Sequence, residues 1–440
     1  MILSGFVTLT CDIDSLRGAT LSPGTESNRF AKWVVVGLLW LVAVLNYADR
    51  MAISSVFPLL KKEMGVSDTA LALVGSSFLW VYSLSSPLGG YFGDRFNRKQ
   101  VIILSLGLFS VVTCVTGFAQ NGVQLIACCV LLGVSEAIFL PSALAHIASF
   151  HTDATRSLAN AICLAGFPVG SGVGVFLGGY MGDHYSWRAG FYFLGIAGIM
   201  VALALVLFLP NRPPLAVESG RRADGDSCHE PPLPKMASIL STPTALCVIA
   251  LGFALSVGSW PTNTWAPMYL FERFGMSLTR SGFTMAFFTY TPALLGSAVG
   301  GIWADRWAKR DCRGRIGVDI VALVFMAPAL LALGFMRSGL RVAVCLFVYS
   351  LARGMAEVNQ MPIFSTVVPP HRWSTAYGLH NLIAGVAGSL GILLVGTLKG
   401  WWGIGYGLSA LSLFLFVGMV VMHVAWRHLA ADMRKLADAG

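Results

Sequence analysis

Charge is scarce in this chain. Of its 440 residues only 12% are charged, whereas 56% are hydrophobic, and the mean hydropathy is +0.71. A soluble domain usually carries about twice that charged fraction, and a single soluble core cannot bury so much apolar sequence. The composition therefore excludes an ordinary soluble enzyme and predicts a membrane protein.

Several kinds of motif are also missing. The nine cysteines show no paired spacing, which argues against a disulfide framework and against a metal site. The first thirty residues lack the basic-then-apolar pattern of a cleaved signal. The apolar segments contain no His-x-x-x-His pair, Ser-Lys dyad or phosphate-binding loop. We therefore expect a protein that is not an enzyme and that needs neither a metal nor a cofactor.

Long hydrophobic windows are what the chain does have. Twelve windows of about 19 to 25 apolar residues recur, and each can cross a bilayer as a helix. Their hydrophobicity is continuous rather than alternating, which favours helices over a barrel. The predicted spans are 33–57, 70–92, 101–119, 123–147, 158–182, 188–210, 244–270, 280–303, 316–336, 340–366, 373–399 and 402–427.

The basic residues indicate an orientation. If the N-terminus is cytoplasmic, twenty of the thirty lysines and arginines fall in cytoplasmic segments, eight in outside loops and two within spans. This bias predicts that both termini are cytoplasmic in a multi-pass protein of the plasma membrane, the inner membrane in a bacterium. The net charge of +9 then reflects membrane topology and does not indicate nucleic-acid binding.

A proline-rich, charged stretch divides the chain into two halves. It lies between the sixth and seventh predicted spans, and its composition is typical of a flexible linker. The predicted organisation is a disordered cytoplasmic leader at 1–30, a six-helix bundle at 31–210, a cytoplasmic linker at 211–238, a second six-helix bundle at 239–427 and a cytoplasmic tail at 428–440.

One loop motif occurs in both halves. GGYFGDRFNRKQ at 89–100 follows the second span, and GGIWADRWAKRD at 300–311 follows the eighth. Both copies begin with two glycines and continue with an Asp-Arg pair and two further basic residues, and the same pattern at corresponding positions indicates an internal duplication. The residues of the motif are Gly90, Asp94, Arg95, Arg98 and Lys99 in the first copy and Asp305, Arg306, Lys309 and Arg310 in the second.

This loop resembles the signature of the major facilitator superfamily of secondary transporters, Gly-x-x-x-Asp-Arg-x-Gly-Arg-Lys. The resemblance covers residues 30–430, although Asn97 and Ala308 stand where the family usually has glycine. It implies an all-α membrane protein whose twelve helices form two pseudo-symmetric six-helix bundles around a central site. The bundles rock to expose that site to each side in turn. The charged loop would latch the cytoplasmic face in one state, whereas anchoring by positive charge alone would account only for its basic residues.

Ionisable side chains within the spans are the candidates for a functional site. Each costs about 2.5–3.5 kcal/mol at the centre of a bilayer, so such residues normally face a cavity. Asp49 and Arg50 are neighbours on one helix, point about 100° apart and need separate partners. The ionisable side chains well within the spans are Asp49, Arg50, Glu136, Arg353, Glu357 and His380.

These side chains suggest different roles. Asp49 and Glu136 are the candidate proton carriers, because an acid in a desolvated site can hold a proton, and Arg50 offers a planar fork suited to a carboxylate. The competing interpretation for Asp49 and Arg50 is a structural ion pair with other helices, and for Glu136 it is a protonated structural glutamate. Arg353 and Glu357 can pair at i,i+4, and His380 can act as a proton relay or as a hydrogen-bonded structural residue. The other candidates for substrate contact are Asn46, Tyr47, Tyr82, Trp265, Asn359 and Asn381.

Short motifs resemble two branches of the family. Asp-Arg late in the first span, Gly-x-x-Glu-Ala in the fourth and TWAPMYL in the seventh resemble the anion:cation symporter branch. That resemblance implies uptake of a sugar acid or other organic anion with protons, the proton gradient being the energy source. NYADR, GDRFNRK and PVGSG resemble Spinster-like transporters, which implies amphiphilic, lipid-like or drug-like compounds as the alternative.

One residue departs from both branches. An arginine is common seven residues before the glutamate of the fourth span, and here that position is Cys129. The substrate class and the direction of transport therefore stay open, and export is an alternative to import. We expect a monomer whose partners are a small anionic substrate, protons and the lipid bilayer. A channel or a non-transporting receptor would differ from a carrier in lacking saturable flux against a gradient.

Overall fold

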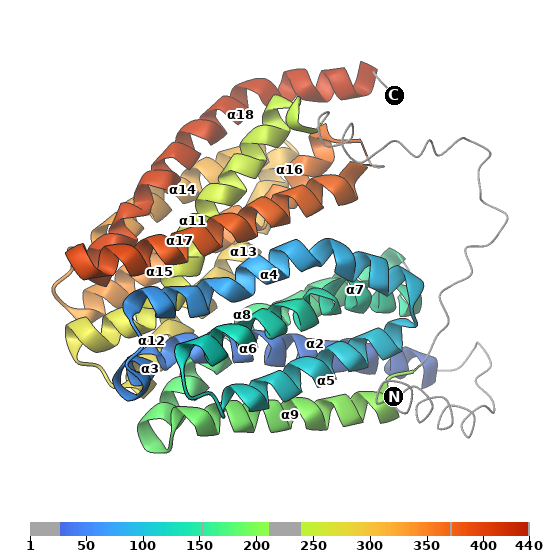
Figure 1. Ribbon diagram of the computed structural model, residues 1–440. Coiled ribbons are helices and arrows are strands. Elements are labelled where there is room, and N and C mark those ends of the chain that lie inside the picture. Colours follow the sequence, from blue (N-terminus) through green and yellow to red (C-terminus); the bar gives the residue numbers. More distant parts are fainter. Residues whose placement is uncertain (1–26, 152, 211–238, 370–371, 439–440) are drawn as a thin grey trace.

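The computed structural model describes residues 27–151, 153–210, 239–369 and 372–438, and within these ranges the secondary structure is helical. Figure 1 shows the helices side by side in two groups, which confirms the predicted two-bundle, all-α architecture. The predicted leader, apart from its last residues, and the predicted linker lie outside the described residues. The boundaries predicted for the segments stay predictions.

Each group is built from helices that are consecutive in the chain. The first comprises α2 (Ser27–Ser55), α3 (Phe57–Met64), α4 (Asp68–Arg95), α5 (Arg98–Thr116), α6 (Gly122–Ala137), α7 (Phe139–Phe150), α8 (Asp153–His184) and α9 (Trp187–Phe208). The second comprises α11 (Pro243–Phe274), α12 (Leu278–Met285), the π-helix η1 (Ala286–Tyr290), α13 (Thr291–Ala308), α14 (Gly314–Leu333), α15 (Gly339–Glu357), α16 (Gln360–Val367), α17 (Trp373–Ala410) and α18 (Ser412–Asp438).

The number of crossings follows from these helices. Ten described stretches are long and apolar enough to span a membrane. The last of them, Thr375–Leu436, holds two crossings, because the helical geometry breaks at Gly403 with φ of 79°. Helix α4 supplies one more. The twelve predicted spans therefore correspond to helices or to consecutive pairs of helices.

The same turn ends the first crossing of each group. Gly65 follows α3 with φ of 64°, and Gly275 follows α11 with φ of 62°. A side chain would be strained in this left-handed conformation, so glycine stops the helix there. Two residues later Ser67 and Ser277 lie beside the start of the next helix, and Ser277 accepts a hydrogen bond from the backbone N–H of Arg280 at 3.2 Å.

Glycines set the close packing of α2 against α8. A Cβ at Gly170 would meet the backbone of Val44, and one at Gly174 would meet Ala48. Because these glycines recur every fourth residue, they form one stripe along α8 and let the two backbones approach directly. The stripe fixes the rotation of α2, and with it the directions in which Asp49 and Arg50 point.

The two groups are tied together at one end of the molecule. Lys399 of α17 binds Asp68 of α4 at 2.8 Å and Glu272 of α11 at 2.9 Å. Asp183, at the end of α8, accepts hydrogen bonds from the backbone N–H and the hydroxyl of Thr279, both at 2.7 Å. We call this end the α3 face, since α3 lies there (Figure 1). The chain enters α2 from the opposite face.

Candidate functional site

Arg50 is enclosed by an acid and by aromatic rings. Its Nη2 donates to Oε2 of Glu136 at 2.6 Å, and the two side chains are only 7% and 1% exposed. Helix α2 carries Arg50, and α6 carries Glu136 in its last turn. Four ring centroids lie between 3.9 and 5.8 Å from Arg50 Cζ. They belong to Tyr47, Phe78, Tyr82 and Trp260.

Arg50 lies at the boundary between the two halves, because the rings around it come from both. Tyr47, Phe78 and Tyr82 come from the first half, whereas Trp260 comes from α11 of the second. A guanidinium stacked against ring faces gains cation–π attraction, which is largest where water is excluded. From the sequence, Tyr47 and Tyr82 are the preferred aromatic candidates, and Trp260 is one of several further rings that a substrate could touch. Phe78 was missed, because an apolar ring within a span has no local signal that separates cavity from core.

Asp49 faces a different helix from its neighbour. Its Oδ2 accepts a hydrogen bond from the hydroxyl of Thr113 on α5 at 2.8 Å, and its Oδ1 is buried without a hydrogen-bond partner. Successive residues on a helix point about 100° apart, so Asp49 and Arg50 use separate partners. In the part of the chain that the structure describes, no cation lies within ion-pair distance of Asp49.

A small cavity adjoins both residues. It has a volume of about 30 Å³, and Trp260 and Thr264 of α11 close it from the second half. Cys129, at the position where the two branches commonly have arginine, is buried in its wall. A cavity of this size holds one or two water molecules. A sugar acid could therefore enter only if the halves move apart.

The second half has its own buried arginine. Arg353 lies 3.5 Å from Glu357 on the same face of α15, and its Nη1 donates to Oδ1 of Asn263 at 3.4 Å. Arg353 is buried, whereas the Glu357 side chain is 44% exposed. Arg353 belongs to α15 of the second half, whereas Cys129, where the two branches commonly have arginine, lies on α6 of the first half.

Glu136 and Glu357 occupy matching positions in the two halves. The sequence GVSEAIFLP at 133–141 and the sequence GMAEVNQMP at 354–362 share a Gly-x-x-Glu-x-x-x-x-Pro pattern. The prolines cannot hydrogen-bond to the carbonyl four residues earlier, and the helix is interrupted there in both halves, between α6 and α7 and between α15 and α16. Sequence reasoning missed this second repeat, although aligning the halves would have found it.

The other residues predicted to contact the substrate lie in different environments. Asn46 is buried one turn before Arg50 and faces Glu136. Trp265 is fully buried, donates to the carbonyl of Ile392 at 3.1 Å and packs near the α3 face rather than beside Arg50. His380 is buried against the edge of Phe364.

Two predicted amides also differ in their surroundings. Asn381 is exposed. Asn359 is fully buried and donates to Asp319, an intramembrane acid that sequence reasoning missed. The substrate roles predicted for these residues stay predictions.

The loop motif is described only in part. The side chains of Gly90, Asp94 and Arg95 lie outside the described residues. Arg98 donates to the carbonyl of Ala145 at 3.2 Å, and Lys99 is buried. The gating role predicted for this copy stays a prediction.

In the second copy of the motif, Asp305 binds Arg315 at the start of α14 at 2.6 Å. Arg306, Lys309 and Arg310 are exposed at this end of α13. The charged contact made by Asp305 therefore stays within the second half.

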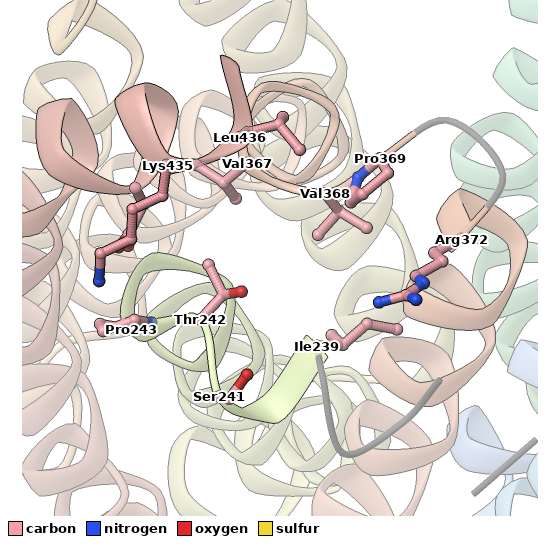
Figure 2. Close-up of a pocket in the computed structure, with 11 residues that line it drawn as sticks. Ile239, Ser241, Thr242, Pro243, Val367, Val368, Pro369, Arg372, Lys435 and Leu436 are labelled. Carbon is pink, nitrogen blue, oxygen red and sulfur yellow. The ribbon is translucent and has the colours of Figure 1, made fainter. Parts of the chain in front are cut away.

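A larger pocket of about 300 Å³ lies where α11 begins (Figure 2). Ser241 and Thr242 lie on one side of it, and Arg372 and Lys435 contribute positive charge. Asp432 of α18 is buried there and accepts hydrogen bonds from the backbone N–H and hydroxyl of Thr244 at 2.9 and 2.7 Å. The chain thus caps this helix end with its own carboxylate, and the pocket belongs to the second half alone.

Metal binding finds no support within the described ranges, where no three His, Cys, Asp or Glu side chains come together as a metal site. Arg50 can bind an anionic group, and Glu136 and Asp49 can each bind a proton.

Comparisons with known proteins agree with this architecture. The chain is 27% identical to an MFS-type efflux pump of Mycolicibacterium smegmatis, over 83% of this chain and 84% of that protein. It is 26% identical to a probable galactarate/D-glucarate transporter of Bacillus subtilis, over 86% of this chain and 88% of that protein. A crystal structure of a bacterial homologue of the lysosomal transporter Spinster, inward-facing and unoccupied, superposes with a TM-score of 0.80 at 19% identity and covers 93% of this chain and 99% of that one. The family model of the Major Facilitator Superfamily matches residues 39–392, most of the chain, so the protein belongs to this family and is a multi-pass membrane transporter rather than an enzyme.

Proposed function

We propose that the protein is a secondary active transporter that carries a small organic anion together with protons by alternating access. The substrate is a sugar acid or another carboxylate, as named for the Bacillus subtilis relative. The chain works as a monomer in the plasma membrane with both termini in the cytoplasm, so that the α3 face is outside. The bias of lysine and arginine toward the opposite face supports this orientation.

The ion pair between Arg50 and Glu136 carries the proposal. A guanidinium fork binds a carboxylate through two parallel N–H donors. Glu136 holds one of those donors at 2.6 Å, and the Nε of Arg50 is buried without a partner. A substrate carboxylate must therefore compete with Glu136 for the same group. A proton on Glu136 removes its negative charge and leaves Arg50 free for the substrate.

Coupling follows from this competition. Because protonation of Glu136 favours anion binding at Arg50, anion binding favours protonation of Glu136 by the same free energy. Asp49, buried and without a cation within ion-pair distance in the described structure, is the second carrier. With both acids neutral and the substrate's charge balanced by Arg50, the closed cavity holds no unpaired charge, and the halves can rock.

The contacts between the halves support the alternating part of the proposal. The α3 face is closed by Lys399, Asp68 and Glu272, and by Asp183 on Thr279. In the proposed orientation, this conformation is closed to the outside. Trp260 lies over Arg50 from the second half, so separation of the halves changes the surroundings of the substrate-binding arginine.

Transport in proteoliposomes tests the proposal. Wild-type protein should accumulate a sugar acid when the outside is acidic, and Asp49→Asn should abolish gradient-driven accumulation. Glu136→Gln should still exchange internal for external substrate, since Arg50 is free, but should not accumulate it. The matched control is Glu63→Gln, which removes a carboxylate outside the site. Wild-type uptake that ignores the pH gradient, or full accumulation by Asp49→Asn, would refute proton coupling.

One observation favours the alternative, transport or export of an amphiphilic or drug-like compound. A cavity of about 280 Å³ lies between the halves, where Pro168 and Val169 of α8 face Phe287, Tyr290 and Leu294. Its apolar lining would suit a hydrocarbon chain, and the Mycolicibacterium smegmatis relative is named as an efflux pump. Thermal-shift measurements with sugar acids, dicarboxylates, aromatic acids and lysolipids separate the two functions. Stabilisation by lysolipids alone would favour the alternative.

A further inference from the structure

Asp319 is a fully buried acid that the proposed transport cycle does not use. It lies in the second turn of α14, and its side chain has no exposed surface. Its Oδ1 accepts one hydrogen bond, from Nδ2 of Asn359 at 3.1 Å, and its Oδ2 has no hydrogen-bond partner. An ionised carboxylate with one neutral donor and no paired cation is costly in such a place.

The hydrogen bond from Asn359 connects Asp319 to the helix interruption between α15 and α16. Asn359 is the second of the two residues between α15 and α16, where Pro362 interrupts the helix, and it also donates to the carbonyl of Met355 at 2.9 Å. Its own Oδ1 is buried without a partner. The pair therefore leaves two oxygens unsatisfied, Asp319 Oδ2 and Asn359 Oδ1. One added proton on Asp319 would supply the missing donor.

The charged group that acts on Asp319 is Arg315, one helical turn earlier on α14. At present Arg315 is held by Asp305 of the loop motif at 2.6 Å. Residues four apart on a helix face one another, so Arg315 can be shared between the two acids. Among the described residues, the turn between α15 and α16 contributes the neutral Asn359, and no side chain of α13, α17 or α18 forms a hydrogen bond or an ion pair with Asp319.

A metal ion fits this place poorly. Hard metal cations bind about six or more oxygen ligands, and within the described ranges no cluster of three acidic, histidine or cysteine side chains is found here. A proton needs only one carboxylate oxygen. The pair of Asp319 and Asn359 is therefore suited to bind a proton rather than a metal ion.

We propose that the second half contains its own proton-binding site at Asp319, and that its occupancy decides which acid holds Arg315. With the proton bound, Asp319 is neutral, and Arg315 stays on Asp305. With the proton lost, the Asp319 carboxylate draws Arg315 inward, and Asp305 and the loop between α13 and α14 are released. This site goes beyond the proposed function, since Asp319 lies in the half that contains neither Asp49 nor Glu136.

Infrared difference spectroscopy tests the proton directly. The purified protein in nanodiscs is titrated from acid to alkaline pH, and the C=O stretch of protonated carboxyl groups is followed. Wild-type protein should lose a band that Asp319→Asn lacks throughout. Asp432→Asn is the matched control, because Asp432 is also buried but accepts two hydrogen bonds from Thr244. That variant should retain the band. A spectrum of Asp319→Asn identical to wild type at every pH would overturn the proposal.

The release of the loop has a native reporter in Cys312. This thiol is exposed, and it lies between Asp305 and Arg315. Its maleimide labelling is measured by mass spectrometry at each pH and divided by the rate in the same chain unfolded in detergent at that pH, so that the ratio reports the accessibility of the thiol. Wild-type labelling should become severalfold faster as Asp319 ionises.

Two variants are compared with wild type in this labelling experiment. Asp319→Asn should label slowly at every pH, and Asp305→Asn should label fast at every pH. Equal pH profiles for Asp319→Asn and wild type would overturn the link to Arg315. Because both outcomes are read without substrate, they are independent of whether transport is proton-coupled.

Discussion

Asp68 and Lys399 are 331 residues apart in the chain and form a 2.8 Å ion pair between the two halves. The Lys399 side chain is only 8% exposed and also binds Glu272. Its ammonium group lies 5.7 Å from the ring of Trp265. This cluster must come apart whenever the α3 face opens, so it biases the equilibrium between the two states of the carrier.

Lys399→Gln should therefore shift the protein toward the state open at the α3 face. A hydrogen bond to a charged group contributes about 1.5–3 kcal/mol, and 1.4 kcal/mol changes a two-state ratio about tenfold. Spin labels on cysteines at Lys62 and Arg280, one in each half, would report the change as a longer distance. Lys61→Gln is the control, because Lys61 binds Asp68 within the first half. Unchanged distances in Lys399→Gln would show that the pair does not bias the equilibrium.

The buried pair of Arg50 and Glu136 should show strong coupling in a double-mutant cycle. Removing one partner of a buried ion pair costs about 3–5 kcal/mol, because the other charge is left unpaired. We expect Arg50→Gln and Glu136→Gln each to lower the thermal unfolding midpoint in detergent, and the double variant to recover part of the loss. Neutralising Arg188 and Glu63, a more exposed pair, should cost at most about 1 kcal/mol. Additive effects at Arg50 and Glu136 would contradict this expectation.

Much of the fold could be predicted from the sequence because a bilayer leaves the chain few choices. Backbone groups in lipid must be paired within a helix or a closed barrel, so long apolar windows translate directly into helices. The duplicated loop at Asp94 and Asp305 then divides the helices into two groups. Neither inference requires knowledge of which side chains touch.

The partners within the site could not be predicted in the same way. Which acid binds Arg50 depends on the relative rotation of α2 and α6, which the glycine stripe of α8 helps to set in three dimensions. Trp265 follows several polar residues in the sequence, yet its side chain is buried in the core because α17 covers it. Asp319 was missed because a single acid near the end of an apolar window has the same pattern as a loop residue.

The matched glycines of the two halves give a test of close packing. A Cβ at Gly133 would lie 2.9 Å from the carbonyl oxygen of Phe78, and one at Gly354 would press on the carbonyl oxygen of Ala293. Because backbone atoms cannot move aside cheaply, each alanine variant should lower the free energy of unfolding by about 1–3 kcal/mol. Gly37→Ala, with open space around the added carbon, should be neutral or stabilising by up to about 1 kcal/mol. Thermal melts that rank Gly37→Ala with the other two would refute this account.

The loss of folding stability at acid pH should depend partly on Glu63. This residue of α3 accepts hydrogen bonds from Trp187 at 2.6 Å and from Arg188 at the start of α9. Burial raises the pKa of Glu63, but the hydrogen bonds from Arg188 and Trp187 and the charge of Arg188 outweigh it, so the pKa lies below its ordinary value. A lowered folded-state pKa stabilises the protein above the unfolded-state pKa, and this contribution is lost as the pH falls through the folded-state pKa.

Glu63→Gln should therefore melt at a lower temperature than wild type at neutral pH, and the difference should shrink as the pH falls below about 4. The effect is modest, since the Glu63 side chain is 48% exposed and water screens its charge. Lys62→Gln, which changes a charge on the same helix, serves as the control and should give a difference that does not vanish in acid. If the difference for Glu63→Gln stayed constant or grew in acid, the link between α3 and α9 would not depend on the ionised carboxylate.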